Sequence, residues 1–226
     1  MTFADRVLTF YRTLKITATL PDEVEVMNPY QDPEAIAACE KFYRQFYNDN
    51  HERILILGIN PGRYGAGVTG IPFTDPIKLE TQFGIHTSLT RKPELSAAFI
   101  HQMIDAFGGY AKFFSRFFIN SVSPLGFVRH GKNLNYYDTP ALKTALEPFI
   151  RKSLENLVRL GVRTDVAFCL GEGENFRYLQ RTGEKHPIFK TIIPLAHPRF
   201  IMQYRRKRVD EYIDDYITKL TSVPWD

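Results

Sequence analysis

Four short apolar runs, separated by segments with helical periodicity, constrain the fold of this chain more than any other feature of its sequence. Each run has the length of a strand and is bounded by Gly, Pro or polar residues, which is typical of strands buried on both faces of a sheet. The predicted strands span 53–59 (RILILGI), 116–122 (RFFINSV), 165–170 (DVAFCL) and 190–195 (KTIIPL). Pro194 is compatible with the last strand because it stands near its end.

Helices are predicted before, between and after these strands, because apolar residues recur there at helical spacing. Asp32 is placed to cap the second helix, and Pro33 suits its first position. The predicted helices span 3–14, 33–48, 93–107, 147–160, 174–181 and 202–220. Strands that alternate with helices form a parallel sheet covered on both faces. We therefore expect an α/β fold, a three-layer α/β/α sandwich around a central four-stranded parallel sheet.

Length and composition fit a single globular domain. The chain has 226 residues, of which 44% are hydrophobic and 24% charged, and these are ordinary values for one α/β unit. We expect one domain over 1–226, with residues 1–50 forming a helical extension packed on it. No apolar run is long enough to cross a bilayer, and the first fifteen residues lack the pattern of a secretory signal. A cytoplasmic, intracellular monomer without a membrane partner is therefore expected.

The two cysteines, Cys39 and Cys169, have no metal-type spacing around them. A reduced, buried pair is expected, as is usual for an intracellular protein. Two thiols cannot supply the four cysteine ligands of an iron–sulfur cluster. We expect neither a metal site nor a cofactor.

Unusual polar residues follow three of the four predicted strands. They are Asn60 after the first strand, Asn120 with Ser123 at the second, and His197 after the fourth. In open parallel sheets the ligand site lies beyond the carboxyl ends of the strands. These side chains are therefore expected to converge on one site.

The first strand runs into a loop rich in Gly and Pro, GINPGRYGAGVTGIPFTD over 58–75. The loop lacks the Gly-Lys-Ser/Thr of a phosphate-binding P-loop and the GxGxxG of a dinucleotide fingerprint. Its glycines and prolines still indicate a loop of defined shape.

Three segments of the chain resemble motifs of the uracil-DNA glycosylase superfamily, in its single-strand-selective monofunctional (SMUG-like) branch. GINPG and TGIPF resemble that branch's Gly-Met-Asn-Pro-Gly and Gly-Val-Pro-Phe, and Phe73 follows Asn60 by thirteen residues, as in the branch. FINSVSPL over 118–125 is similar to the family's strand that ends in Asn just before a Pro-Leu. The sequence from His197 to Arg199 resembles the family's His-Pro-Ser-Pro-Arg without its Ser-Pro pair.

The resemblance implies hydrolysis of the N-glycosidic bond of uracil in DNA, after the nucleotide has left the base stack. Phe73 would be the surface on which the extruded pyrimidine stacks, and the Asn120 amide would pair with N3–H and O4 of uracil. Asn60 would orient the attacking water. His197 would donate a hydrogen bond to O2 of the departing base, where negative charge develops.

The resemblance also places Ile59 and Gly62 beside C5 of the base. Arg63 and Tyr64 stand where the family has Pro and Phe, so the range of bases remains open. One alternative is a glycosylase of the same fold that prefers xanthine, hypoxanthine or mismatched thymine. A second alternative is a non-catalytic protein that binds DNA or nucleotides. No lysine stands at the strand ends, so a Schiff-base lyase step is not expected.

The segment after His197 is basic and, by the resemblance, corresponds to the loop that wedges into DNA. The net charge of the chain is +4, and 199–208 contains basic residues but no acid. Within the segment 199–202, apolar side chains inserted between bases would offset the cost of unstacking, and basic side chains would bind phosphates. The residues expected to contact single- or double-stranded DNA are Arg199, Phe200, Arg205, Arg206, Lys207 and Arg208. The alternative is an ordinary helix start that packs in the core.

Overall fold

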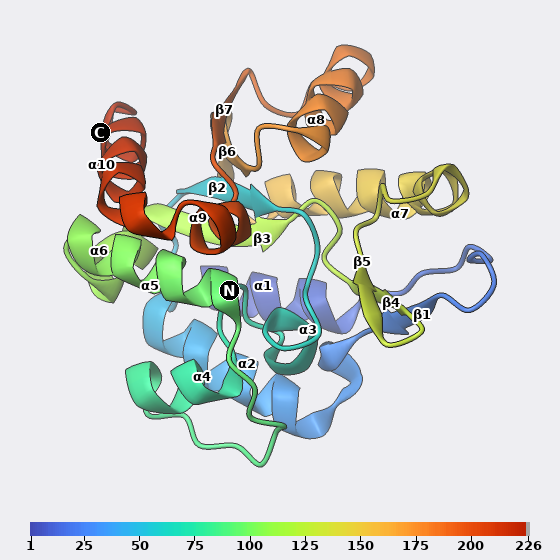
Figure 1. The fold of residues 1–226 in the computed structure, drawn as a ribbon, viewed down its shortest axis with the longest axis horizontal. Helices are drawn as coiled ribbons and strands as arrows, with labels where there is room; N and C mark the ends of the chain where they lie inside the picture. The colour runs from blue at the N-terminus through green and yellow to red at the C-terminus, as the bar shows by residue number, and fades with distance from the viewer. Residues whose placement is uncertain (225–226) are drawn as a thin grey trace.

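A computed structural model describes residues 1–224, apart from the side chain at position 185. Its centre is a four-stranded parallel sheet in the order β3-β2-β6-β7, with helices on both sides (Figure 1). The strands are β2 (Arg53–Gly58), β3 (Phe117–Ser121), β6 (Val162–Leu170) and β7 (Thr191–Leu195). The predicted three-layer α/β fold and its four-stranded parallel sheet are confirmed.

The register of the sheet aligns the carboxyl ends of its strands. Gly58, the last residue of β2, lies opposite Ser121 at the end of β3. On the other side of β2, Leu57 lies opposite Cys169 of β6, and the final residues of β6 and β7, Leu170 and Leu195, lie opposite each other. The loops that leave these strands therefore begin at one edge of the sheet.

Helices α1 (Phe3–Arg12) and α2 (Pro33–Phe46) pack against one face of the sheet, while α5 (Leu95–Phe107) packs against the other. The ring of Phe3 in α1 meets that of Phe118 at 5.2 Å. The ring of Phe107 in α5 meets the neighbouring Phe117 at 5.5 Å. Because successive strand residues point to opposite faces, these two contacts place the helices on opposite sides. The predicted cap is also confirmed, since Asp32 accepts from two backbone amides of α2.

Two predicted helices differ from those in the structure by more than a few residues. Helix α7 (Pro140–Arg159) begins before the predicted residue 147, because Thr139 caps it and Pro140 suits its first position, while Pro148 lies inside it. The predicted helix 202–220 is two helices, α9 (Pro198–Tyr204) and α10 (Val209–Thr221), joined by the 3₁₀ turn η2 (Arg206–Arg208). Helix α8 (Glu174–Lys185) packs on β6.

A small antiparallel sheet and several short helices were not predicted. The sheet consists of β1 (Glu25–Met27), β4 (Gly126–Arg129) and β5 (Lys132–Leu134) in the order β1-β4-β5, and it lies apart from the central sheet (Figure 1). The additional helices are η1 (Pro29–Gln31), α3 (Ala66–Thr69), α4 (Pro76–Phe83) and α6 (Tyr110–Arg116). Strands of three or four residues are too short to show a reliable periodicity in sequence.

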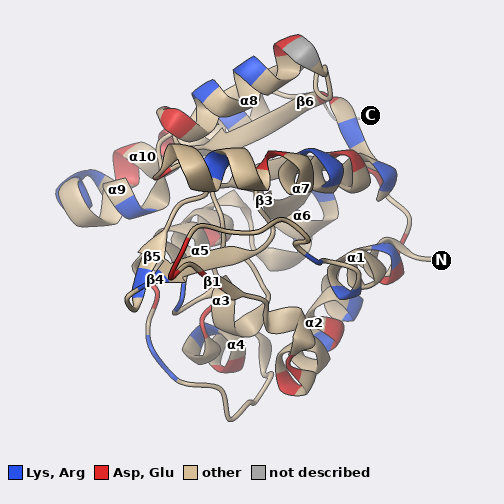
Figure 2. Cartoon of the chain, turned by 90° about the vertical axis from the view of Figure 1, so that its right-hand side faces the viewer, with Lys and Arg blue, Asp and Glu red and all other residues tan. Residues whose placement is uncertain are grey.

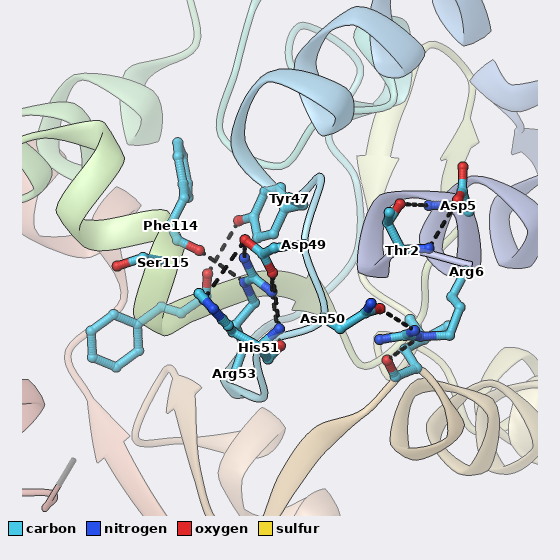
Figure 3. Close-up of polar contacts among 12 residues, drawn as sticks. Thr2, Asp5, Arg6, Tyr47, Asp49, Asn50, His51, Arg53, Phe114 and Ser115 are labelled. Atoms are coloured by element: carbon cyan, nitrogen blue, oxygen red, sulfur yellow. Dashed lines mark hydrogen bonds and ion pairs between the residues drawn. The ribbon is translucent and has the colours of Figure 1, made fainter. Parts of the chain in front are cut away.

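A buried arginine ties the amino-terminal helices to the sheet (Figure 3). Arg53, the first residue of β2, is fully buried. Its guanidinium makes a two-pronged ion pair with Asp49, at 2.7 and 2.8 Å. It also donates to the Phe114 carbonyl at 3.0 Å and lies over the rings of Phe3 and Tyr47. The contacts of this one side chain join α1, the end of α2, β2 and α6.

The buried apolar residues form one cluster that includes residues of α1, α2 and the central sheet. Cys39 and Cys169 are both buried and unpaired, as predicted. Among the described helices, none combines the length and the apolar character that a bilayer crossing needs.

Candidate active site

The side chain of Asn60 is fixed by the backbone at the end of strand β5 and just after it. Its Oδ1 accepts from the backbone amide of Tyr136 at 3.0 Å, and its Nδ2 donates to the Leu134 carbonyl at 3.1 Å. These two contacts define which amide atom is oxygen. One lone pair of Oδ1 remains available to accept a hydrogen bond from a water. An amide cannot take up the proton of that water, so Asn60 can orient a nucleophile but cannot deprotonate it.

A buried polar network behind Asn60 links the strand ends, and the sequence analysis missed it. The Tyr136 hydroxyl donates to Asn175 Oδ1 at 2.9 Å. Asn175 Nδ2 in turn lies 3.3 Å from the carbonyls of Gly58 and Leu170, the last residues of β2 and β6. Neither residue belongs to a recognisable motif. Their role depends on contacts between distant parts of the chain, which a local pattern does not reveal.

His197 caps helix α9 and is held in one tautomer. Its Nδ1 accepts from the backbone amide of Arg199 at 3.1 Å, so the hydrogen of the neutral ring is on Nε2. Burial, together with the positive charge of Arg199, lowers the pKa of His197 to about 4. The ring is therefore neutral at physiological pH and presents Nε2–H as a donor.

Phe73 belongs to the loop after β2, and its half-buried ring lies near the end of that strand. A β carbon built on Gly58 would lie 3.7 Å from the Phe73 ring and 3.4 Å from the Ser121 hydroxyl. The ring and the hydroxyl thus share one side of the strand end. Phe73 has a backbone φ of +52°, a conformation uncommon for a bulky residue.

Asn120 faces the other side of the sheet, contrary to the expectation that it pairs with the base. It is 2% exposed. Its Nδ2 donates to the Tyr11 hydroxyl of α1 at 3.0 Å, and its Oδ1 accepts from the Ser121 amide at 2.7 Å. Since side chains alternate along a strand, Ser121 and not Asn120 shares the side of Phe73. The structure therefore does not bring Asn120 and Phe73 together.

The loop that follows β2 has a polar edge at Gly62. A β carbon on Gly62 would lie 3.6 Å from Asn133 Nδ2 and 3.9 Å from Glu94 Oε1. Asn133 also accepts from the Arg63 amide at 3.1 Å. Ile59, the other residue expected near C5 of a base, is half-buried, and its carbonyl accepts from the Ser123 amide at 3.1 Å.

Glu94, at the start of α5, is a further polar residue that the sequence analysis missed. Its Oε2 is buried and has no hydrogen-bond partner among the described residues. A β carbon on Gly65 would overlap this oxygen, so a larger residue there would displace the Glu94 carboxyl group. Burial and the negative charge of Asp75 raise the pKa of Glu94 to about 7, although the nearby Arg199 opposes the rise. A lone Glu after a Pro gives no sequence signal that its carboxyl group will be buried.

Helix α9 presents an exposed aromatic pair beside basic side chains. Phe200 is 41% exposed and Tyr204 is 62% exposed. Their rings lie 5.8 Å apart, and the Arg205 guanidinium lies over Phe200. Ile201 and Met202 are buried, which corrects the expectation that they belong to the wedge. They point to the core because α9 is a helix and not a loop.

The predicted basic residues around α9 are exposed but not equally free. Arg199, Arg205, Arg206, Lys207 and Arg208 are all exposed. Arg208 forms an ion pair with Glu211 on the next turn, at 2.6 Å. Figure 2 shows Lys and Arg both on α9 and on the β4–β5 hairpin, along the same side of the molecule. Arg63 and Lys92 add positive charge over the Tyr64 ring.

A hollow elsewhere on the surface does not coincide with these residues. It is lined by His51, Thr164 and Lys190 among others, at the amino ends of the strands. The polar side chains described above gather at the opposite ends. Their chemistry, and not the size of a hollow, identifies the candidate site.

Comparison with known proteins agrees with this arrangement. The family model described as the uracil DNA glycosylase superfamily matches residues 44–221. The crystal structure of wild-type SMUG2 from Pedobacter heparinus is similar to this chain, with a TM-score of 0.95 and 45% sequence identity. The similarity covers 98% of each chain.

Proposed function

Because the chain belongs to the uracil DNA glycosylase superfamily, whose members act on DNA, we propose that it removes uracil from DNA and leaves an abasic site. The observation that best supports this proposal is the tautomer of His197. Its Nδ1 is occupied by the Arg199 amide, so a neutral ring has its Nε2–H available for a departing base. A neutral donor suits a leaving group that becomes an anion, because it stabilises the charge without needing to transfer its proton.

In the proposed reaction the bond between C1′ of the deoxyribose and N1 of uracil breaks with both electrons leaving on the base. The sugar becomes an oxocarbenium cation, and the uracil anion accepts the His197 hydrogen bond at O2. A water held by the free lone pair of Asn60 Oδ1 then adds to C1′, and its proton is released to solvent or to the uracil anion. Asn60 suffices because the cation is already electrophilic when the water adds.

Base recognition is proposed to involve Phe73, Ser121 and the loop edge at Gly62. The extruded base would stack on the Phe73 ring, next to the Ser121 hydroxyl. Asn120 would support the strand end through its contact with Tyr11 and would not read the base. A single hydroxyl can donate or accept, so it discriminates less sharply than an amide with fixed donors and acceptors.

The polar edge at Gly62 supports a second candidate, a glycosylase that also accepts deaminated purines. Asn133 Nδ2 and Glu94 Oε1 lie near the β-carbon position of Gly62, and we propose that the atoms of a larger ring would extend toward them. Hypoxanthine and xanthine present acceptors at O6 and N7, which suit an amide donor and a protonated carboxyl group. The activity on purines is therefore proposed to depend on these two side chains.

Contact with DNA is proposed to centre on α9. The exposed Phe200 and Tyr204 would insert beside the extruded nucleotide, and Arg199, Arg205 and Arg206 would bind flanking phosphates. We propose that the protein acts on DNA as a monomer.

The experiment uses the purified full chain and labelled oligonucleotides with uracil, xanthine or hypoxanthine, each single- and double-stranded, together with a duplex that contains a T·G mismatch. Abasic sites are measured as alkali-sensitive strand breaks under single-turnover conditions. We expect cleavage of uracil DNA, with a loss of about 10²- to 10³-fold in His197→Ala and a comparable loss in Asn60→Ala. The matched control is His186→Ala, which changes an exposed histidine at the end of α8. Binding of uracil DNA without any abasic product, unchanged in Asn60→Ala, would identify a non-catalytic DNA-binding protein instead.

A further inference from the structure

His101 is buried in α5, where no motif marks it, and it reaches the backbone of Phe73. It is 5% exposed. Its Nε2 lies 3.1 Å from the carbonyl oxygen of Phe73, and its Nδ1 lies 2.7 Å from the Tyr110 hydroxyl. A carbonyl can only accept, so Nε2 carries the hydrogen and Nδ1 is left as the acceptor. This hydrogen bond joins α5 to the residue proposed to stack on the base.

The neighbours of His101 favour this neutral tautomer. With Nε2 protonated, Nδ1 can only accept, so the Tyr110 hydroxyl in α6 is the donor to it at 2.7 Å; Oε1 of Gln82 in α4, 3.0 Å away, is a second acceptor for the same hydroxyl hydrogen. Burial, and to a smaller extent the positive charge of Lys78, lowers the pKa of His101 to about 4. The Phe83 ring packs against the imidazole at 5.9 Å. Three helices therefore hold the ring in place.

The carbonyl that His101 binds belongs to a residue in an unfavourable conformation. The φ of Phe73 is +52°, which bulky residues rarely adopt without support. Thr69 fixes the loop beyond Phe73 by donating to the Thr74 carbonyl at 2.6 Å. His101 supplies the contact to the Phe73 carbonyl itself. The direction of the Phe73 ring depends on this backbone conformation, because a change in φ and ψ would swing the side chain away from Gly58.

We propose that His101 is a positioning residue for Phe73. By donating to the Phe73 carbonyl, it keeps that residue in the left-handed conformation and aims its ring at the strand end where an extruded base would lie. The inference rests on the proposed function, since the ring affects catalysis only if a base stacks on it. His101 itself is assigned no contact with the substrate.

Two substitutions of His101 separate the hydrogen bond from the bulk of the side chain. His101→Gln keeps an N–H donor at a similar reach, and His101→Leu removes the donor while filling a similar volume. We expect kcat/KM on uracil DNA to fall about ten- to hundredfold in His101→Leu and to stay near the wild-type value in His101→Gln. Equal losses in the two variants would overturn the proposal.

The matched control is Tyr30→Phe. Tyr30 also donates to a carbonyl of the same loop, that of Gly70 at 3.0 Å, but it does not contact Phe73 through this bond. We expect this variant to retain activity. A loss as large as that of His101→Leu would mean that general loosening of the loop, and not the position of Phe73, explains the effect.

A double-mutant cycle tests whether His101 acts through Phe73. In the Phe73→Ala background, His101→Leu should cause no further loss of kcat/KM. Independent, additive losses would contradict the proposal. Tyr110→Phe, which removes the donor to Nδ1, provides a milder variant if His101→Leu does not fold. It should cause a smaller loss that is likewise absent in the Phe73→Ala background.

Crystal structures of the variants test the inference without any assay of activity. The φ of Phe73 should remain positive in His101→Gln and leave the left-handed region in His101→Leu. An unchanged Phe73 in His101→Leu would overturn the inference. If the wild-type protein cleaves none of the lesion oligonucleotides, the proposed function fails, and the conformation of Phe73 still decides whether His101 positions it.

Discussion

Burial changes the chemistry of the titratable residues near the strand ends. His197 and His101 have a pKa lowered to about 4, chiefly by burial, and are therefore neutral hydrogen-bonding groups. Burial acts in the opposite sense on the carboxyl group of Glu94, whose pKa is raised to about 7. In each case the neutral form is favoured, because a buried charge loses its hydration. The candidate site thus relies on fixed donors and acceptors more than on ionised groups.

The pKa of His197 leads to a prediction for the pH dependence of catalysis. If the neutral ring is the active form, lowering the pH through 6.5, the ordinary pKa of histidine, should not reduce kcat/KM. The decline expected from His197 comes only as the pH approaches about 4. Single-turnover rates between pH 4.5 and 8 measure this. To separate His197 from the nearby carboxyl group, the same profile is recorded in Glu94→Gln. A midpoint near 6.5 in both proteins would contradict the assignment.

Glu94 leads to a prediction for stability. The pKa of its carboxyl is about 7 in the folded protein against an ordinary 4.5. Folding therefore favours the protonated form, so this stabilisation is full below pH 4.5 and is lost as the pH rises through about 7. Glu94→Gln stays neutral at every pH. We expect it to match the wild type at pH 4.5 and to be more stable by about 1–3 kcal/mol at pH 8.

Urea unfolding at the two pH values tests this prediction, with Glu155→Gln as the control on the exposed surface of α7. The control should not change the pH dependence. A Glu94→Gln variant with the same pH dependence as the wild type would contradict the raised pKa.

At the scale of elements, short segments outside the central sheet determine how the site is built. Strand β5 fixes the Asn60 amide through the Leu134 carbonyl. His197 caps helix α9, so the first turn of this helix orients the imidazole and presents Phe200 to solvent. The break at Arg205 ends this helix and exposes the basic turn η2. The proposed chemistry and the proposed DNA contact are therefore joined by a single turn of helix.

This junction leads to a prediction about strand type. Phe200→Ala should lower the single-turnover rate on double-stranded uracil DNA by about tenfold, because extrusion from a duplex costs a few kcal/mol that an inserted ring offsets. The rate on single-stranded DNA, which needs no unpairing, should fall less. Val26→Ala is the control, since Val26 is 40% exposed but lies on β1. Equal losses on the two substrates would argue against insertion of Phe200.

At the scale of the whole molecule, the amino-terminal helices are integrated with the sheet. Tyr11 contacts Asn120, Phe3 packs on Phe118, and Arg53 binds the chain between α2 and β2. These contacts support the proposal that residues 1–226 form one domain. A protein without 1–50 would expose aromatic rings and leave Arg53 without Asp49.

Arg53 provides the test of this integration. Arg53→Met removes the positive charge and the Arg53 donors to Asp49 and to the Phe114 carbonyl, while Asp49 keeps the hydrogen bond from the His51 amide. We expect a loss of about 2–3 kcal/mol in the free energy of unfolding, less than for a fully buried ion pair because the Asp49 side chain is 33% exposed. Arg44→Met, which breaks exposed ion pairs with Asp5 and Glu40, should cost less than about 1 kcal/mol. Urea unfolding followed by two probes measures both. Two separate transitions would contradict a single domain.

Much of the architecture could be predicted from the sequence because it depends on neighbours along the chain. The apolar runs determine the four strands, and their alternation with helices determines a parallel sheet. The spacing of Asn60 and Phe73 and the position of His197 after the last strand were likewise local features, and they indicated the family. Strands of three residues and the early start of α7 were missed, because their periodicity was short or interrupted by Pro148.

Tertiary structure decided which face of the sheet each functional side chain lies on and which ring nitrogen of each histidine carries the hydrogen. Asn120 and Tyr11 are 109 residues apart, and Asn60 and Tyr136 are 76 apart, so no local pattern shows that either pair is in contact. A shift of one position along a strand moves a side chain to the opposite face, and this separates Asn120 from Ser121. Burial and packing then set the tautomers of His197 and His101. The sequence alone determined the strands and the residue types at their ends. Long-range contacts decided which face each of these side chains lies on, its protonation and its hydrogen-bond partner, because the residues that set these properties come together only on folding.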